Sequence, residues 1–249
     1  MFTFKIICAT VIFIITIFSG IYPFFSKLKN KTFLAMPRAE ALSVGVFLGA
    51  GLIHMLGESS AHFLALDIEY PIAFLIAGSV FLLFLLLEHV AKEIYQHGNK
   101  SSIAFAYVAT FMMSIHGFLA GAALGLTDSL SLAFIVLFAI MAHKWAESFA
   151  LALHISKSAL PFSYAITLFL IFSLMTPLGI FAGSYTTNFI SDYATIEATF
   201  LALAAGTFLY FGSLHGLEKS VLITECCNLS VFLYVILGFA LMAVIAVWA

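Results

Sequence analysis

The sequence predicts an all-α integral membrane protein, a bundle of eight transmembrane helices with both termini extracytoplasmic. Three observations lead to this class: 63% of the 249 residues are hydrophobic, only 9% are charged, and the mean hydropathy is +1.15. Soluble domains carry roughly 45–50% apolar and about 25% charged residues. With about 20 apolar residues needed per span, this composition allows seven or eight spans. It excludes a water-soluble enzyme and a receptor with a large ectodomain.

The apolar runs define the expected elements. The first run ends near Pro23 without a small-residue cleavage site, so we interpret it as a retained helix, although an uncleaved signal anchor has a similar pattern. Every later break is short, so we expect a single polytopic transmembrane domain over residues 1–249. The expected spans are about 4–25, 39–62, 71–95, 102–126, 130–155, 162–185, 195–217 and 230–248.

A polar or helix-breaking segment justifies each boundary between these runs. Charged residues, glycine, proline and asparagine interrupt an apolar helix and favour turns. The segments are, in order, the basic loop Lys27–Arg38, the acidic link Asp67–Pro71, His97–Lys100, Thr127–Ser129, Lys157–Pro161, Asn188–Asp192 and Glu218–Glu225.

Lysine and arginine fall on one side of the expected membrane. The loops after the first, third, fifth and seventh runs hold eight of these residues, and the other three loops hold none. Cytoplasmic loops carry this excess, so both termini should face outside, in a plasma membrane or a bacterial inner membrane. The outer connections hold acids instead, which raise the local cation concentration. These acids are Asp67, Glu69, Asp128, Asp192 and Glu197.

Several classes of partner and site are disfavoured. A net charge of −2 provides no basic surface, so no nucleic-acid partner is expected. Cys8 and the adjacent pair Cys226–Cys227 form neither a metal-ribbon spacing nor a disulfide framework. The chain also has no phosphate-binding glycine loop and no HExxH motif.

Ionisable residues inside the spans carry the functional signal, because such residues are costly in hydrocarbon and mark pathways or sites. His116 and His143 lie near mid-membrane in neighbouring antiparallel spans, and Glu147 follows His143 by one turn on the same face. Two nitrogens and one oxygen suit Zn²⁺, with Fe²⁺, Mn²⁺, Cu²⁺ or Cd²⁺ as alternatives. The competing interpretation is that both histidines hydrogen-bond to neighbouring helices and that Glu147 pairs with Lys144.

Other polar residues suggest paths to and from this site. His54, Glu58 and His62 are spaced four apart and form one stripe toward the outer surface, which predicts a relay for incoming ions. An exit relay is suggested toward the cytoplasm. Its candidates are His89, His154 and His215, which fall toward the cytoplasmic ends of their spans, as Glu88 and His97 also do. Half-solvated helix ends are the alternative explanation for both sets.

With these residues placed, the chain resembles the ZIP family of divalent-metal transporters over all eight spans. The residues that carry the resemblance are the segments Gly45–Leu56, His116–Gly121, His143–Lys144, Met175–Ile180 and Ala204–Tyr210, the last being very similar to the animal-type branch. The resemblance implies an eight-helix bundle with a metal site between the fourth and fifth helices. It also implies metal uptake toward the cytoplasm, elevator-like alternating access and frequent dimerisation, which leaves a homodimer open.

The chain departs from the family pattern at the expected site. The family's fourth span normally has an acid four residues after its His, where this chain has Ala120. Relatives that bind a second ion use positions occupied here by Gly117 and Lys144, so we expect a single-metal site. His215 stands where relatives often have an acid, and Ser114, Ser148 or water are the expected additional ligands.

The leading hypothesis is therefore a divalent-metal transporter, not an enzyme, that carries Zn²⁺ as its transported ion, with no cofactor and with the lipid bilayer as its surroundings. One alternative is an intramembrane metal-dependent hydrolase in which Ser114 and His215 join His116. The other is a metal sensor that no longer transports, which the replacement of an acid by Ala120 makes conceivable.

Overall fold

The computed structural model describes residues 1–28, 36–94, 99–186, 193–214, 216–217 and 228–247, and these residues form helices and short turns without a strand. Residue 215 and the first half of the expected turn His97–Lys100 lie outside the described residues, whereas Asn99 and Lys100 belong to the first turn of α5. The elements are α1 (Phe2–Leu28), α2 (Pro37–Gly49), the π-helix η2 (Ala50–Met55), α3 (Leu56–Ala65), α4 (Ile72–Ile94), α5 (Asn99–Leu126), α6 (Leu130–Lys157), α7 (Phe162–Thr186), α8 (Tyr193–Tyr210) and α9 (Leu229–Ile245).

The all-helical class is confirmed. Seven stretches of helix among the described residues are long and apolar enough to cross a membrane, and one of them joins α2, η2 and α3 into a continuous segment, Pro37–Ala65. The eighth expected span, 230–248, is shorter than expected, because α9 ends at Ile245 after 17 residues. At 1.5 Å per residue, α9 is about 25 Å long.

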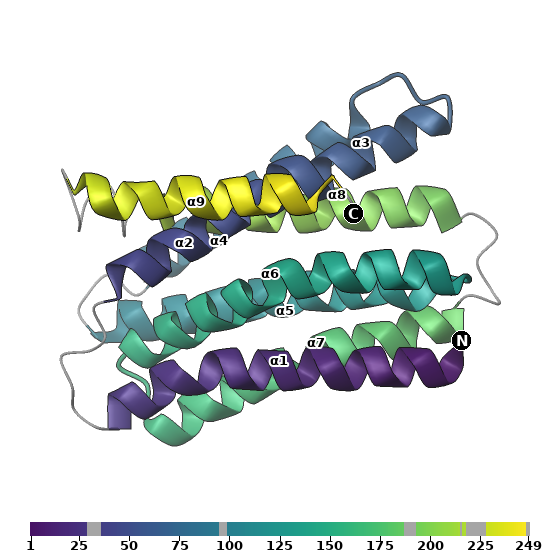
Figure 1. Ribbon diagram of the computed structural model, residues 1–249. Helices are drawn as coiled ribbons and strands as arrows, with labels where there is room; N and C mark the ends of the chain where they lie inside the picture. The colour runs from purple at the N-terminus through teal and green to yellow at the C-terminus, as the bar shows by residue number, and fades with distance from the viewer. Residues whose placement is uncertain (29–35, 95–98, 187–192, 215, 218–227, 248–249) are drawn as a thin grey trace.

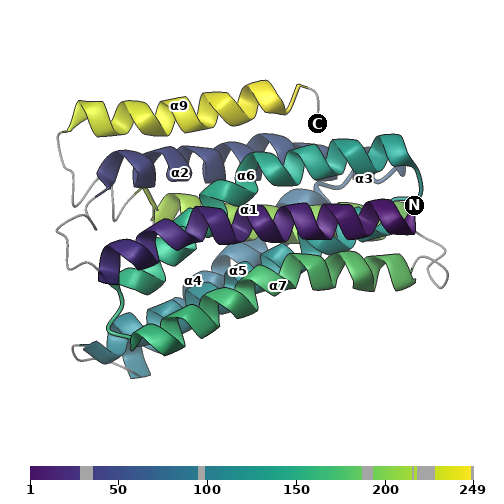
Figure 2. The same ribbon diagram turned by 60° about the horizontal axis from the view of Figure 1, so that its bottom comes forward.

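The helices pack in two groups that lie side by side (Figures 1 and 2). In the first group α1 packs against α6 and α7, and α5 lies along α7; in the second, α2 lies along α9, α4 along α8, and α3 against α8. Buried hydrogen bonds link helices within each group. Lys5 Nζ on α1 donates to the carbonyl of Gly125 on α5 at 2.6 Å, and Ser59 Oγ on α3 donates to the carbonyl of Ala198 on α8 at 2.6 Å.

Glycines bring α5 and α7 into close contact. A Cβ atom added at Gly121 would collide with the backbone of Thr176, and one added at Gly179 would collide with the backbone of Phe118. Because glycine has no side chain, it allows helix backbones to approach this closely in membranes. The first group is therefore held together by backbone contact next to His116.

The π-helix η2 interrupts the long helical segment Pro37–Ala65 at the position of His54. It begins at Ala50 directly after Gly49, contains Gly51 and His54, and packs against α8. A π turn inserts one extra residue per turn and changes the direction of the side chains that follow it, and such turns are frequent at functional sites. In this protein η2 carries His54 next to the His143 ring, with 6.4 Å between ring centroids.

Candidate metal site

Three predicted ligands come together between α5 and α6. His116 is 0% exposed, and His143 and Glu147 are each 1% exposed. One ligand atom from each residue lies within 4.8 Å of the other two. The ligands of a tetrahedral Zn²⁺ lie about 3.4 Å apart, since each bond is about 2.1 Å long. Side-chain movements of about 1 Å would therefore allow all three residues to bind one ion.

The hydrogen bonding of these residues contains features of both interpretations: His116 Nδ1 contacts a neighbouring helix and Glu147 pairs with Lys144, whereas the other ring nitrogens are left for an ion. Among the described residues, His116 Nε2 and both ring nitrogens of His143 are buried without a hydrogen-bond partner. Buried polar atoms in folded proteins are nearly always paired, and leaving one unpaired costs about 1–3 kcal/mol. A buried cluster in which one ring nitrogen of each histidine lies within 4.8 Å of a carboxylate oxygen is expected for a site that receives an ion.

Lys144 occupies the position next to this cluster. Its Nζ lies 3.1 Å from Glu147 Oε2 and 4.4 Å from the centre of the Phe172 ring, and the side chain is 1% exposed. A Cβ atom added at Gly117 would lie 3.3 Å from this ammonium and 2.9 Å from Thr176 Oγ1. Gly117 thus leaves space that the ammonium uses, and the predicted pairing of Lys144 with Glu147 is present.

Helix α8 contributes two residues that the sequence analysis did not single out. Thr207 Oγ1 lies 2.8 Å from His116 Nδ1, and the Phe208 ring stacks on the His116 ring with centroids 3.9 Å apart and planes 19° apart. The same phenyl ring meets the His143 ring edge-on at 5.1 Å. Both histidine rings are therefore held between their own helices and α8.

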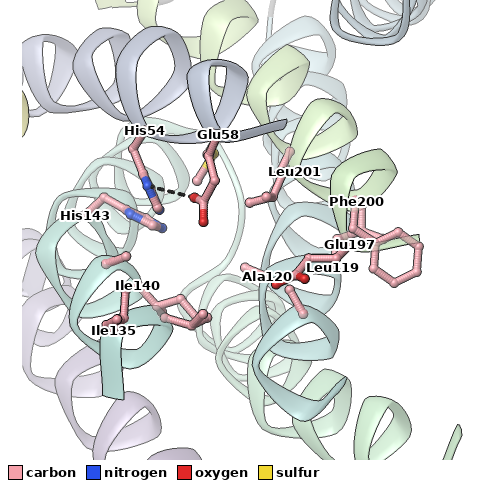
Figure 3. Close-up of a pocket in the computed structure, with 15 residues that line it drawn as sticks. His54, Glu58, Leu119, Ala120, Ile135, Ile140, His143, Glu197, Phe200 and Leu201 are labelled. Carbon is pink, nitrogen blue, oxygen red and sulfur yellow. Dashed lines mark ion pairs between the residues drawn. The ribbon is translucent and has the colours of Figure 1, made fainter. Parts of the chain in front are cut away.

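A small cavity lies beside His143 and is lined by residues of η2, α3, α5, α6 and α8 (Figure 3). It has a volume of about 30 Å³, which is room for a water molecule or a small ion. His54 Nδ1 lies 3.2 Å from Glu58 Oε2 at its wall, and Figure 3 shows both side chains beside the His143 ring. Ala120 lines the same cavity, one turn of α5 away from His116.

Glu197 also lines this cavity, which corrects its expected place in an outer loop. It lies in α8 one turn after the helix begins at Tyr193. The expected span 195–217 already begins two residues before Glu197, and the charge of this residue alone led to its being counted with the acidic link before the span. The cavity wall therefore carries two carboxylates, from Glu58 and Glu197.

Comparison with known proteins decides the family. The profile of the family described as ZIP Zinc transporter matches residues 99–246, more than half of the chain and including all of α5 to α9. The chain belongs to the ZIP zinc transporter family. The protein is accordingly a multi-pass membrane protein, in agreement with its seven long apolar helices among the described residues.

Individual ZIP proteins resemble the chain along most of its length. Zinc transporter 11 of Arabidopsis thaliana is 26% identical over 98% of this chain and 85% of its own length. The human zinc transporter ZIP2 is 27% identical over 84% of each chain. Protein zntD of Dictyostelium discoideum is 31% identical over 63% of this chain and 23% of its own length.

Some residues expected near the ZIP metal site lie elsewhere. His62 is half-buried and close enough to Glu197 to interact with it electrostatically, but it does not line the cavity beside His54 and Glu58. Ser148 Oγ donates to the carbonyl of Lys144 at 2.7 Å, and Ser114 lines a separate apolar groove between α5 and α7. Neither serine is part of the His116 cluster as described.

The two described exit candidates, His89 and His154, have different surroundings. His89 is exposed on α4, and the half-buried His154 ring packs against Phe105 at 5.7 Å. The neighbouring Glu88 is buried rather than half-solvated, because it accepts a hydrogen bond from the Tyr210 hydroxyl and pairs with Lys92 at 2.7 Å. His215 is outside the described residues. His154 is thus the one described candidate that faces other helices.

Proposed function

We propose that this protein carries a divalent metal ion, with zinc as the preferred ion, across a cell membrane toward the cytoplasm through a single-metal site. The proposed ligands are His116, His143 and Glu147. The observation that carries the proposal is the buried cluster in which one ring nitrogen of each histidine and a Glu147 carboxylate oxygen lie within 4.8 Å of one another. Nitrogen and oxygen ligands in this ratio suit Zn²⁺, and the relatives named above are zinc transporters. Fe²⁺, Mn²⁺, Cu²⁺ and Cd²⁺ are the other candidates.

One ion, rather than two, fits the charges next to the ligands. The Lys144 ammonium already lies 3.1 Å from the carboxylate that a second ion would share, and Gly117 supplies no ligand. A second divalent ion at that position would meet a positive charge in a buried region where like charges repel strongly. We therefore infer that the Lys144 charge and the lack of a ligand at Gly117 prevent a second ion from binding.

The direction of transport follows from the distribution of charge and the position of the cavity. The first turn of α1 and the last turn of α9 lie toward the same end of the bundle (Figures 1 and 2), which supports an even number of crossings in a single transmembrane domain. The distribution of lysine and arginine supports extracytoplasmic termini. The cavity is lined by Glu58 and Glu197, which are close in sequence to the acidic connections that the positive-inside rule places outside. His54 and Glu58, together with Glu197, are the proposed path inward; His62 lies beside that path, and His154 is the proposed exit.

Alternating access is supported by the two helix groups. The proposed ligands belong to α5 and α6 in the first group, and the cavity beside them is lined by both groups, with about half of its wall from η2, α3 and α8 in the second. Movement of the first group along the second would carry the ligands away from the outer cavity without breaking the glycine contact between α5 and α7. The described residues give no specific support to the hydrolase alternative, since Ser114 lies in a different groove.

The test is zinc binding and flux in the purified full-length chain. We expect about one Zn²⁺ bound per chain, and we expect His143→Ala and Glu147→Gln each to weaken affinity by tenfold or more, on the scale of losing a direct ligand. His89→Ala, which removes an exposed histidine on α4, is the matched control and should bind zinc as the unmodified protein does. Equal affinity in His116→Ala, His143→Ala and the control would rule out the proposed ligands.

Flux into liposomes separates a carrier from a sensor. Reconstituted protein should move zinc down its gradient without a nucleotide, and the His143→Ala variant should lose most of that flux. Zinc binding that depends on His143 without any flux would support the sensor alternative and would contradict the proposed transport.

A further inference from the structure

Thr207 forms a hydrogen-bonded chain that ends on a proposed metal ligand. Its Oγ1 lies 2.6 Å from the carbonyl oxygen of Ala204 on the same helix and 2.8 Å from His116 Nδ1 on α5. Thr207 is 1% exposed and His116 is fully buried. Water therefore does not compete for either contact.

The number of available protons fixes the direction of both bonds. A threonine hydroxyl has one proton, and a backbone carbonyl can only accept. The 2.6 Å contact with Ala204 therefore uses the hydroxyl proton, and Thr207 Oγ1 accepts a hydrogen bond from the Nδ1–H of His116. A neutral imidazole carries one N–H, so His116 Nε2 holds a lone pair. That atom is also the buried ring nitrogen without a partner.

We propose that Thr207 is a positioning residue for ion binding: it holds His116 in the tautomer whose Nε2 is free to bind the metal. This inference rests on the proposed function, in which His116 is a ligand. Histidines that bind metals usually donate their other ring N–H to a fixed acceptor, and removal of that acceptor typically lowers metal affinity ten- to a hundredfold. Phe208 cannot take this role, because ring stacking fixes the plane of His116 but does not select a tautomer.

The hydrogen bond between Thr207 and His116 joins two helix groups, so its effect on zinc affinity depends on how these groups are arranged. His116 belongs to the first helix group, whereas Thr207 is on α8 in the second. Sliding of α5 along α8 would separate the two atoms and release the Nδ1–H, so the other tautomer would become accessible. High affinity would then be a property of the arrangement described here, and the same movement that exposes the site to the other side would weaken its hold on the ion.

The experiment compares Thr207→Val, which keeps the shape but removes the acceptor, with Thr207→Ser, which keeps the hydroxyl. We expect Val to weaken zinc affinity ten- to a hundredfold and Ser to restore it to within about threefold. Thr16→Val is the matched control, because Thr16 is buried on α1 and bonds only to its own helix, with its Oγ1 2.8 Å from the Ile12 carbonyl. This control should bind zinc normally.

A second measurement requires no Thr207 variant. In zinc-free protein with ¹⁵N-labelled histidine, the His116 signals, assigned by their loss in His116→Ala, should show a protonated Nδ1 and an unprotonated Nε2. A protonated Nε2 in the unmodified protein would overturn the inference, as would normal zinc affinity in Thr207→Val. If His116→Ala itself binds zinc normally, the proposed ligand set fails; if only Thr207→Val does, the inference fails and the ligand set stands.

Discussion

Ala120 offers a direct test of where the ion binds. It lines the cavity beside His143 and follows His116 by one helical turn, so a Glu side chain at this position would extend toward the proposed ligands. At about 4 Å and an effective dielectric near 20, unit charges attract by about 4 kcal/mol, which becomes about 8 kcal/mol for a divalent ion. Burial of the new carboxylate offsets several kcal/mol of this attraction. We expect a net gain of about 1.5–3 kcal/mol in Ala120→Glu, or roughly ten- to a hundredfold tighter zinc binding.

The measurements are zinc affinity by calorimetry and zinc flux into liposomes. Tighter binding with slower release should lower the maximal flux of Ala120→Glu while also lowering the zinc concentration at half-maximal flux. Ala120→Gln is the matched control, because its amide has nearly the same shape without the charge, and it should change affinity by less than about threefold. If Ala120→Glu and Ala120→Gln bind zinc equally, the ion does not lie near this part of the cavity and the placement of the site is refuted.

Three further predictions concern stoichiometry, topology and packing. Lys144→Asp should raise bound zinc from about one toward two ions per chain, measured by elemental analysis after equilibrium dialysis; a value that stays at one would contradict the role given to the ammonium. In a cysteine-free background, a membrane-impermeant reagent added to intact cells should label Asp128→Cys and should fail to label Asn99→Cys, and the reverse pattern would invert the proposed orientation. Gly179→Ala should lower the free energy of unfolding by about 1–3 kcal/mol, because its Cβ would collide with α5. Thermal denaturation measures this loss. Gly78→Ala on α4 is the control, because its Cβ would meet nothing within 4 Å, and it should leave stability unchanged or raise it. An equal loss of stability in both variants would show that close packing is not the cause.

The limits of the helices were predictable because the bilayer sets their lengths. The expected spans 71–95 and 130–155 correspond to Ile72–Ile94 and Leu130–Lys157, with ends that agree to within two residues. The π-helix within Pro37–Ala65 was not predictable, since hydropathy does not distinguish α from π turns. Its wider turn packs against α8, and such a contact between distant segments has no local signal in the sequence.

The same distinction between local and distant contacts applies to the site. His143 and Glu147 share one face of one helix, so their spacing alone places them together, and His116 could be added by its depth in the neighbouring span. Thr207 is 91 residues from His116, and an isolated threonine in an apolar run looks like any other buried polar side chain. Glu197 was missed for a different reason, since it falls within a few residues of a helix start, where boundaries from hydropathy are least accurate.

The buried pair of Lys144 and Glu147 determines how the membrane voltage acts on the proposed carrier. Without an ion, the two neutral imidazoles and this pair sum to zero formal charge, wherever the shared proton lies; with Zn²⁺ the sum is +2. A potential of 100 mV supplies about 2.3 kcal/mol per charge that crosses, or about 4.6 kcal/mol for the loaded site. A cell interior that is electrically negative would therefore pull the loaded site inward and exert no force on the empty one. The rate of return would then be set by the packing between the two helix groups, independently of voltage.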